Sequence, residues 1–377
     1  MEHTCRPTPL AVSIVTLATI FFLSACGNSN SSLTQSSPQP TTLGATIDNL
    51  VQAQMQQNGI PAMTVALAKK GQMLYVRGYG TSDLAKGGPN QSSTVFEIGS
   101  ITKQFTAALI MQLQEQGKLH IDDSAVSYLP GYGFAPAITI RMLLNQTSGL
   151  ADFTNFGNFG QWVLDGVSEP DALTEIAQAG LQFTPGSQYA YSNSNYYLLG
   201  SIIEKVSGEA YAVDLQQNIF VPLALKNTFY DLPPASLAAS GYTHNGAALV
   251  PATIWNRSAA FAAGALSSNV YDLAAWDYAL MSSKVVSAAS FQAMTSSNGF
   301  YQDSYSYGFG LALSTYNGRK LMWHAGQIGG FYTENVVFLD NSFTLIILTN
   351  DQDYDTDSFV FTILDAVCLS SQLSNNC

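Results

Sequence analysis

A serine and a lysine three positions apart, Ser100 and Lys103, form an S-x-x-K pattern. Apolar residues at helical spacing follow as far as Gly117, so the pattern predicts a helix that begins at Ser100. Positions three apart share one helix face, and the N-terminal N–H groups favour developing negative charge. Burial lowers the pKa of a lysine, which would suit Lys103 to proton transfer with Ser100. A capping serine beside a surface lysine would also explain the pattern.

A second pattern is Tyr191-Ser192-Asn193, the only Y-x-N among 19 tyrosines. It follows a turn signal at Pro185-Gly186 and precedes a helix expected over 196–206. A loop before a helix can present a phenol and an amide to a site. The alternative is an aromatic packing loop in which Asn193 caps the helix.

The third pattern is His324-Ala325-Gly326, which we expect at the end of a strand. That strand is expected to follow the hairpin turn that Asn317-Gly318 predicts. Gly326 would allow another backbone to come close. A strand-terminal histidine with a satisfied hydrogen bond is the alternative interpretation.

The elements that must position these patterns divide into two kinds. Strand patterns lie at both chain ends, and 100–300 is mostly helical. They predict an α+β fold, in which both ends build one antiparallel sheet flanked by helices and a mainly helical domain is inserted between them. The α/β part covers 43–98 and 301–377, and the helical part about 99–300. The expected strands are 62–68, 73–79, 307–316, 320–325, 332–339 and 342–349, with helices at 46–58 and 359–367.

The N-terminus has the features of an export signal. The apolar run 10–23 is shorter than a membrane span and suits a secretory signal peptide over 1–25. Leu23-Ser24-Ala25-Cys26 resembles the lipobox of bacterial lipoproteins, which implies a lipidated Cys26; an ordinary signal peptide is the alternative. A flexible tether follows to residue 42. We therefore expect an exported, lipid-anchored protein of the cell envelope, facing the periplasm or the exterior.

Composition and charge exclude several partners. The 377 residues include 14 Lys and Arg against 26 Asp and Glu, which argues against nucleic acid and against polybasic membrane docking. The acidic run 351–357 lacks the Gly and Glu of a calcium loop, so we expect it to stabilise the N-terminus of the last helix. His120, His244 and His324 are scattered, so we expect no metal and no cofactor. Cys368 and Cys377 could pair or stay free.

Taken together, the three patterns and their order resemble the serine β-lactamase and penicillin-binding-protein superfamily, within it the class C-like esterases, D-aminopeptidases and DD-carboxypeptidases. The resemblance covers roughly 43–366. The supporting phrases are Phe96–Thr106, Leu143–Leu150, Tyr191–Asn193, Ala263–Ser268, Tyr307–Gly310 and His324–Gly326.

The resemblance implies a serine hydrolase that cleaves an ester or amide through an acyl-enzyme on Ser100. Lys103 would keep a positive charge or a proton route beside Ser100. Tyr191 would be the base or proton shuttle, with a pKa that the lysine lowers. Asn193, His324 and Gly326 would bind or orient the substrate. The resemblance places the oxyanion hole at the backbone N–H groups of Ser100 and Gln327.

Two departures from the family pattern bear on the substrate. Ala325 lacks the hydroxyl of the family's K-T-G or H-T-G, which helps to bind a carboxylate, and His324 is mostly neutral near pH 7. Both favour small ester, amide or peptide substrates over β-lactams. The alternatives are a β-lactamase or D-alanyl-D-alanine carboxypeptidase, and a non-catalytic ligand-binding lipoprotein. The family's usual histidine after Leu-Leu-Thr is Gln146 here. Aromatics such as Phe153, Phe156, Phe159 and Trp162 either line the acyl pocket or pack in the core.

Overall fold

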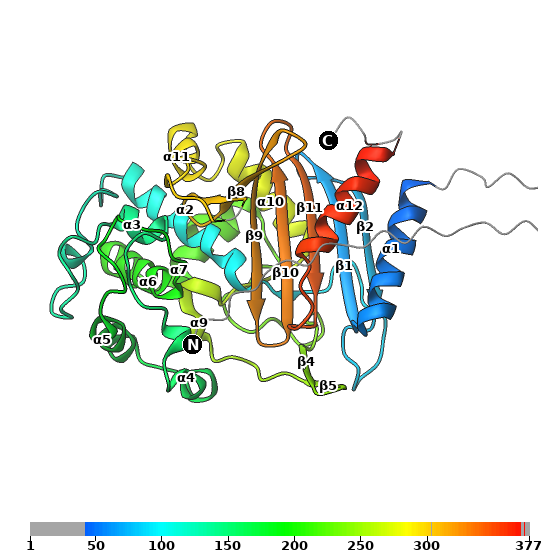
Figure 1. Ribbon diagram of the computed structural model, residues 1–377, viewed down its shortest axis with the longest axis horizontal. Coiled ribbons are helices and arrows are strands. Elements are labelled where there is room, and N and C mark those ends of the chain that lie inside the picture. The colour runs from blue at the N-terminus through cyan, green and yellow to red at the C-terminus, as the bar shows by residue number, and fades with distance from the viewer. Residues whose placement is uncertain (1–41, 303, 371–372, 374–377) are drawn as a thin grey trace, which may run out of the picture. The chain divides into compact units, whose positions relative to one another are not determined.

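Strands from the two ends of the chain form one seven-stranded antiparallel sheet, in the order β2-β1-β11-β10-β9-β8-β7 (Figure 1). The N-terminal hairpin β1–β2 pairs with β11, so the last strand lies beside the first. The sheet predicted from both chain ends is therefore confirmed. Its strands are β1 (Ala62–Lys69), β2 (Gln72–Gly80), β7 (Ser306–Tyr307), β8 (Ala312–Tyr316), β9 (Arg319–Ile328), β10 (Phe331–Phe338) and β11 (Phe343–Thr349).

The computed structural model describes residues 42–302, 304–370 and 373. They belong to one structural unit that begins at Thr42. The expected signal peptide, Cys26, nearly all of the expected tether and Cys377 lie outside the described residues. Cys368 is disulfide-bonded. Among the described helices, none has both the length and the apolar composition that a membrane span needs.

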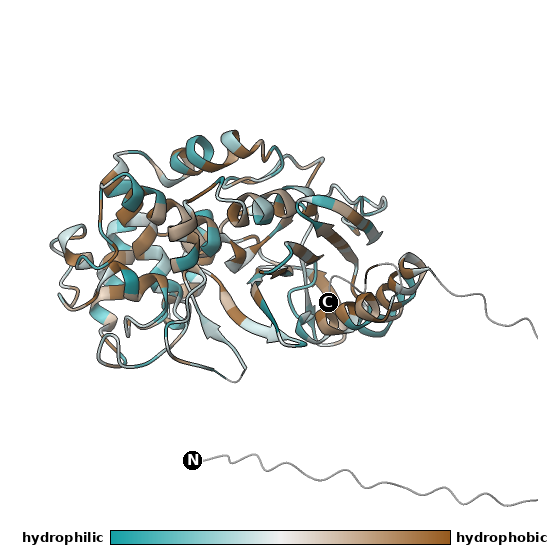
Figure 2. Cartoon of the chain, turned by 90° about the horizontal axis from the view of Figure 1, so that it is seen from above, coloured by the Kyte–Doolittle hydropathy of each residue, from teal (hydrophilic) through white to brown (hydrophobic). Residues whose placement is uncertain are grey.

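Helices cover both faces of the sheet. On one face, α1 (Leu43–Asn58) and α12 (Asp357–Leu369) lie side by side and bury apolar residues such as Ile47 and Ile363 (Figure 1). On the other face, α10 (Val270–Met281) packs against β1, β2 and β11. Most helices carry both apolar and polar residues, as expected of helices that each bury one side (Figure 2).

The segment between β2 and β7 supplies the other helices and two small sheets, β3–β6 and β4–β5. The helices are α2 (Thr102–Glu115), α3 (Ile140–Leu144), α4 (Phe159–Asp165), α5 (Glu169–Ala179), α6 (Asn193–Ser207), α7 (Tyr211–Leu215), α8 (Val221–Leu223), α9 (Arg257–Gly264) and α11 (Ala288–Met294). The short strands are β3 (Phe96–Glu97), β4 (Tyr242–Asn245), β5 (Ala248–Pro251) and β6 (Ser267–Ser268). Single turns η1 (Gly99–Ile101), η2 (Ala125–Ser127) and η3 (Phe153–Asn155), with the π-helical η4 (Gln216–Phe220), complete the segment.

Two expected strands differ in extent from the structure. The strand expected over 307–316 is interrupted between β7 and β8, where a Cβ on Gly308 or Gly310 would overlap the backbone of Met294 or Lys103. This close packing brings the segment against α2. The strand expected to end near His324 continues to Ile328, so His324 lies inside β9.

Candidate active site

Ser100 lies in the single turn η1, immediately before α2. Gly99 has a φ of 48°, a conformation that glycine adopts without strain. No side-chain hydrogen bond caps either η1 or α2, so the hydroxyl of Ser100 is not used as a helix cap. It instead accepts a hydrogen bond of 2.9 Å from Nζ of Lys103. The structure thus favours the chemical interpretation of S-x-x-K over the capping one.

Lys103 is fully buried beneath Ser100. Its Nζ also donates to Oδ1 of Asn193 at 2.8 Å and to the carbonyl of Ala263 at 2.7 Å. Burial lowers the pKa of Lys103 to about 7, although the carboxylate of Asp152 acts in the opposite direction. The expected lowering of this pKa is confirmed. Near neutral pH, both the amine and the ammonium are present, as a group that gains and loses a proton requires.

Tyr191 lies beside the lysine, with its ring centroid 4.9 Å from Nζ of Lys103. The expectation that Lys103 lowers the pKa of Tyr191 is wrong. Burial raises this pKa above its usual value, and only the neighbouring Ser100 hydroxyl opposes the shift. Lys103 does little to lower the pKa of Tyr191, because burial disfavours the charged form of the lysine itself. Tyr191 is therefore a neutral phenol, which can donate a proton but is a poor initial base.

Asn193 is the first residue of α6, and its side chain links two charged groups. Oδ1 accepts from Lys103, and Nδ2 donates to Oδ2 of Asp152 at 3.0 Å. The alternative role as a helix cap is not observed, because the N-cap position is Ser192. Asp152 was missed from the sequence because nothing in its neighbourhood resembles a catalytic pattern.

Gln146 holds the segment that carries Tyr191 and Asn193. It is fully buried, and its Oε1 accepts from the amide of Ser192 at 3.1 Å and from Nδ2 of Asn195 at 2.5 Å. The glutamine at the position of the family's histidine thus fixes the start of α6. This role could not be inferred from the sequence, because it depends on a contact across 46 positions.

His324 is a neutral histidine with a defined tautomer. Burial and the nearby Lys103 lower its pKa to about 3. Its Nδ1 lies 2.5 Å from the carbonyl of Ala325, which can only accept, so Nδ1 carries the proton. Nε2 then accepts from the hydroxyl of Tyr307 at 2.8 Å. The expected neutrality of His324 is confirmed, and it leaves no positive charge here to bind a carboxylate.

The end of β9 lies against the turn that carries Ser100. A Cβ on Gly326 would overlap the carbonyl of Ile98, and one on Gly99 would lie 2.9 Å from the amide nitrogen of Gln327. Beyond Trp323, β9 has β10 on one side and no longer pairs with β8. This end of β9 borders the cavity next to Ser100 through His324, Ala325, Gln327 and Ile328.

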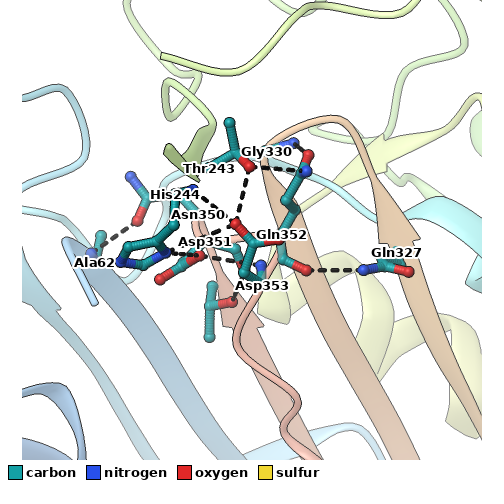
Figure 3. A network of polar contacts seen from close by, with 10 residues as sticks. Ala62, Thr243, His244, Gln327, Gly330, Asn350, Asp351, Gln352 and Asp353 are labelled. Carbon is teal, nitrogen blue, oxygen red and sulfur yellow. Dashed lines mark hydrogen bonds and ion pairs between the residues drawn. The ribbon is translucent and has the colours of Figure 1, made fainter. Parts of the chain in front are cut away.

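The side chain of Gln327 is held by a polar network around Gln352, a residue that does not line the cavity (Figure 3). Its Nε2 donates to the carbonyl of Gln352 at 2.8 Å. Gln352 in turn accepts from the amide of Gly330 and donates to Thr243 of β4. The β4–β5 hairpin thus supports the strand end that carries Gln327.

The same network contains a group with metal-ligand chemistry (Figure 3). Nδ1 of His244 lies 3.7 Å from Oδ1 of Asp351 and 3.6 Å from Oδ2 of Asp353, and the three side chains could hold a metal ion. The sequence missed this group, since its histidine and acids are more than 100 positions apart. Asp351 and Asp353 therefore belong to this group rather than stabilising the N-terminus of the last helix, as was expected. Asp355 does, because its Oδ1 accepts from the first amide of α12.

A cavity of about 470 Å³ opens over Ser100. Of the residues expected at the site, Lys103 and Gly326 do not line this cavity, and the others do: Ser100, Tyr191, Asn193, His324 and Gln327. Of the four aromatics considered from the sequence, Phe153 lines the cavity and also belongs to the core. Trp162 is buried in the core, and the half-buried Phe156 and Phe159 pack against it. Six aromatic residues of the cavity wall were missed, because segments far apart in the chain supply them: Tyr189, Trp255, Tyr305, Tyr307, Trp323 and Tyr332.

Comparisons with known proteins agree with this geometry. The sequence profile of the Beta-lactamase family matches residues 47–364. The chain is 32% identical to penicillin-binding protein 4* of Bacillus subtilis over 317 residues, which is 78% of this chain and 69% of that protein. It spans 64% of a second relative, the putative penicillin-binding protein PbpX of the same organism.

Solved structures share the fold. The D-stereospecific amidohydrolase from Streptomyces sp. superposes with a TM-score of 0.74 at 27% identity, covering 86% of this chain and 98% of that one. The D-amino acid amidase from Ochrobactrum anthropi SV3 gives 0.75 at 26% identity, with coverages of 85% and 98%.

Proposed function

The chain belongs to the Beta-lactamase family and is a serine hydrolase, and we propose that it cleaves an ester or amide bond through an acyl-enzyme on Ser100. The observation that carries the assignment is the 2.9 Å contact between Oγ of Ser100 and the buried Nζ of Lys103. Nucleophile and base within hydrogen-bond reach are the signature of covalent catalysis.

In the first half-reaction, the neutral amine of Lys103 takes the proton of Ser100 as Oγ bonds to the substrate carbonyl carbon. The oxyanion forms next to the backbone N–H groups of Ser100 and Gln327, and each such donor typically contributes about 10²–10³ in rate. When the intermediate collapses, the bond to the leaving group breaks. Tyr191 donates its proton to the leaving group and regains one from the ammonium of Lys103.

The second half-reaction repeats these transfers with water. Lys103 accepts a proton from the attacking water, the bond between Oγ and the acyl carbon breaks, and Ser100 recovers its proton. Asn193 keeps the amine of Lys103 aimed at Oγ through its 2.8 Å hydrogen bond. No cofactor is needed, because every proton has a donor and an acceptor among these side chains.

The substrate we propose is a small ester, amide or peptide without a carboxylate at the position that β-lactams present. Ala325 has no hydroxyl, and neutral His324 supplies no positive charge. The similarity to a D-stereospecific amidohydrolase and to a D-amino acid amidase supports this choice. The similarity to penicillin-binding protein 4* favours the second candidate, a β-lactamase or D-alanyl-D-alanine carboxypeptidase.

Intact-mass spectrometry tests the proposal. The purified protein is mixed briefly with p-nitrophenyl butyrate and, separately, with benzylpenicillin, and Ser100→Ala is the control. We expect a butyryl adduct that decays within minutes and no penicillin adduct. A persistent penicillin adduct on Ser100 would select the second candidate. Ester turnover that survives Ser100→Ala would refute the assignment of the nucleophile.

We also propose that residues 1–25 are removed and that Cys26 is lipidated, so that the enzyme is anchored in the cell envelope. The lipobox-like Leu23–Cys26 and the polar segment after it support this proposal. A clickable fatty-acid analogue should label the protein in cells, and Cys26→Ser should abolish the label and release activity from the membrane fraction. Labelling that survives this substitution would refute the anchor.

A further inference from the structure

Three potential metal ligands come together where β4 lies beside the segment that follows β11 (Figure 3). His244 belongs to β4, and Asp351 and Asp353 lie just beyond the end of β11. The two backbones are joined there, because the amide of Tyr242 donates to the carbonyl of Asn350 at 3.1 Å. One potential ligand atom from each of the three side chains lies within 4.8 Å of the other two. We call these three side chains the metal-ligand group.

The distances inside the metal-ligand group suit one small ion better than direct hydrogen bonds. Nδ1 of His244 lies 3.7 Å from Oδ1 of Asp351 and 3.6 Å from Oδ2 of Asp353, and both separations are too long for a hydrogen bond. Nitrogen and oxygen ligands hold zinc at about 2.0–2.2 Å, so two ligands of one tetrahedral ion lie about 3.4 Å apart. The two nitrogen–oxygen separations are therefore close to the spacing that zinc requires.

A buried oxygen of Asp351 is further evidence for a ligand. This side chain is 1% exposed, and its Oδ1 accepts from the amide of Asp353 at 3.0 Å. The other oxygen, Oδ2, is buried and has no hydrogen-bond partner among the described residues. A buried carboxylate oxygen without a donor costs folding free energy. A cation bound by the same carboxyl group would offset that cost.

The charge of the metal-ligand group also favours a cation. Among the ion pairs of the described residues, those of Asp351 and Asp353 involve only His244. An imidazole that binds a metal is neutral, so a divalent ion would balance the two carboxylates. The imidazole nitrogen also selects the class of metal. It suits zinc and similar transition metals, whereas calcium takes six to eight oxygen ligands.

The metal-ligand group adjoins the network that holds Gln327. Gln352, which lies between the two acids in the chain, accepts from Gln327 through its carbonyl and donates to Thr243 at 3.0 Å. Thr243 precedes His244 and donates to Asp353 at 2.8 Å. An ion held from both sides would therefore join the β4–β5 hairpin to the segment after β11 and restrain the residues between its ligands.

We propose that His244, Asp351 and Asp353 bind one divalent transition-metal ion of the zinc class, which joins the β4–β5 hairpin to the segment after β11 and stabilises the position of Gln327. Three protein ligands leave a fourth position for water. The ion takes no part in bond cleavage. The proposal departs from the sequence-based expectation of no metal, which rested on the scatter of the histidines along the chain. The site is independent of the proposed function, and only its effect on turnover through Gln327 rests on that function.

Calorimetry with zinc chloride tests the site on the purified protein after treatment with a chelator and dialysis. We expect one ion per chain with a Kd of about 1 μM or tighter. His244→Ala and Asp353→Asn, both at exposed positions, should each weaken binding at least about 100-fold, with the fold retained by circular dichroism. The control His120→Ala should bind like the wild type, although Nδ1 of His120 also lies 3.7 Å from a carboxylate, that of Asp122. No binding by the wild type, or binding that survives both substitutions, would overturn the site.

Thermal unfolding and kinetics measure what the ion does. Zinc at about 100 times its Kd should raise the Tm of the wild type by about 5 °C and leave that of His244→Ala unchanged. The zinc-loaded wild type should have a several-fold higher kcat for p-nitrophenyl butyrate than the chelated protein, with KM little changed, because Gln327 acts on the oxyanion. His244→Ala should show no such response to zinc. An unchanged kcat in active protein would overturn the link to Gln327. Calorimetry decides the metal site without turnover, so an inactive protein would contradict the proposed function alone.

Discussion

Replacing Asp152 by Asn should shift the pH dependence of catalysis to lower pH. Asp152 reaches Lys103 through one amide, with hydrogen bonds of 3.0 Å and 2.8 Å on its two sides. An asparagine can still accept from Nδ2 of Asn193, so the substitution removes the charge and keeps this link, while the amide of Thr154 loses the acceptor that Oδ1 of Asp152 supplies. Since the carboxylate favours the ammonium form of Lys103, its loss lowers the pKa of the lysine further below about 7.

The size of the shift follows from the separation of the charges. Two hydrogen bonds through one amide put the ammonium nitrogen and the carboxylate at most about 8 Å apart. At an effective dielectric constant of about 20, unit charges at that distance interact by about 2 kcal/mol. Asp152 is only half-buried, and solvent screening reduces this value. We therefore expect a shift of roughly one pH unit.

The assay is kcat/KM for p-nitrophenyl butyrate between pH 5 and 9 at constant ionic strength. The wild-type rate should rise with pH to a plateau with a midpoint near 7, because only the neutral amine can accept the proton of Ser100. For Asp152→Asn, the midpoint should lie near 6, whereas Asp165→Asn, an exposed acid on α4, should leave it unchanged. An unmoved or upward-shifted midpoint would refute Lys103 as the base.

Three further predictions concern stability and positioning. Burial raises the pKa of Asp277 to about 7, so the folded state loses stability as pH rises from about 4 to 7. Asp277→Asn should therefore raise the free energy of unfolding at pH 8 by up to about 4 kcal/mol. The same substitution should have little effect at pH 4, and urea unfolding measures both values. Gly326→Ala should lower the same free energy by about 3 kcal/mol, because its methyl group overlaps the carbonyl of Ile98; a neutral effect would contradict that packing. Gln146→Ala should reduce kcat by about 10- to 100-fold with the fold retained by circular dichroism, and an unchanged kcat would show that α6 needs no such support.

The sheet could be predicted from the sequence because its signals are local. Alternating apolar residues and the turn at Asn317-Gly318 specify strands wherever they occur, and the observed β9 begins at Arg319, directly after this turn. The extent of each strand was less predictable. The break between β7 and β8 arises from packing against Met294, which no local pattern records.

The site was predictable to the extent that its residues stand in short motifs. Ser100 and Lys103 share a helix, so their contact follows from helical geometry. The predicted shift in the pKa of Tyr191 had the wrong direction. This pKa depends on burial, which the whole fold creates. Asp152 and the metal-ligand group around His244 were missed for a related reason: their partners come from distant segments and belong to no motif.

The pairing of the first strand with the last has a consequence for how the protein folds. The amide of Ala62 donates to Oδ1 of Asn350 across 288 positions of sequence, so this sheet cannot close until nearly the whole chain has been synthesised (Figure 3). Non-local pairing of this kind slows the search for the native state, because a long loop must close before its contacts form. Until then the edge of β1 that later pairs with β11 stays unpaired, which exposes the hairpin β1–β2 to aggregation and to capture by chaperones during biogenesis.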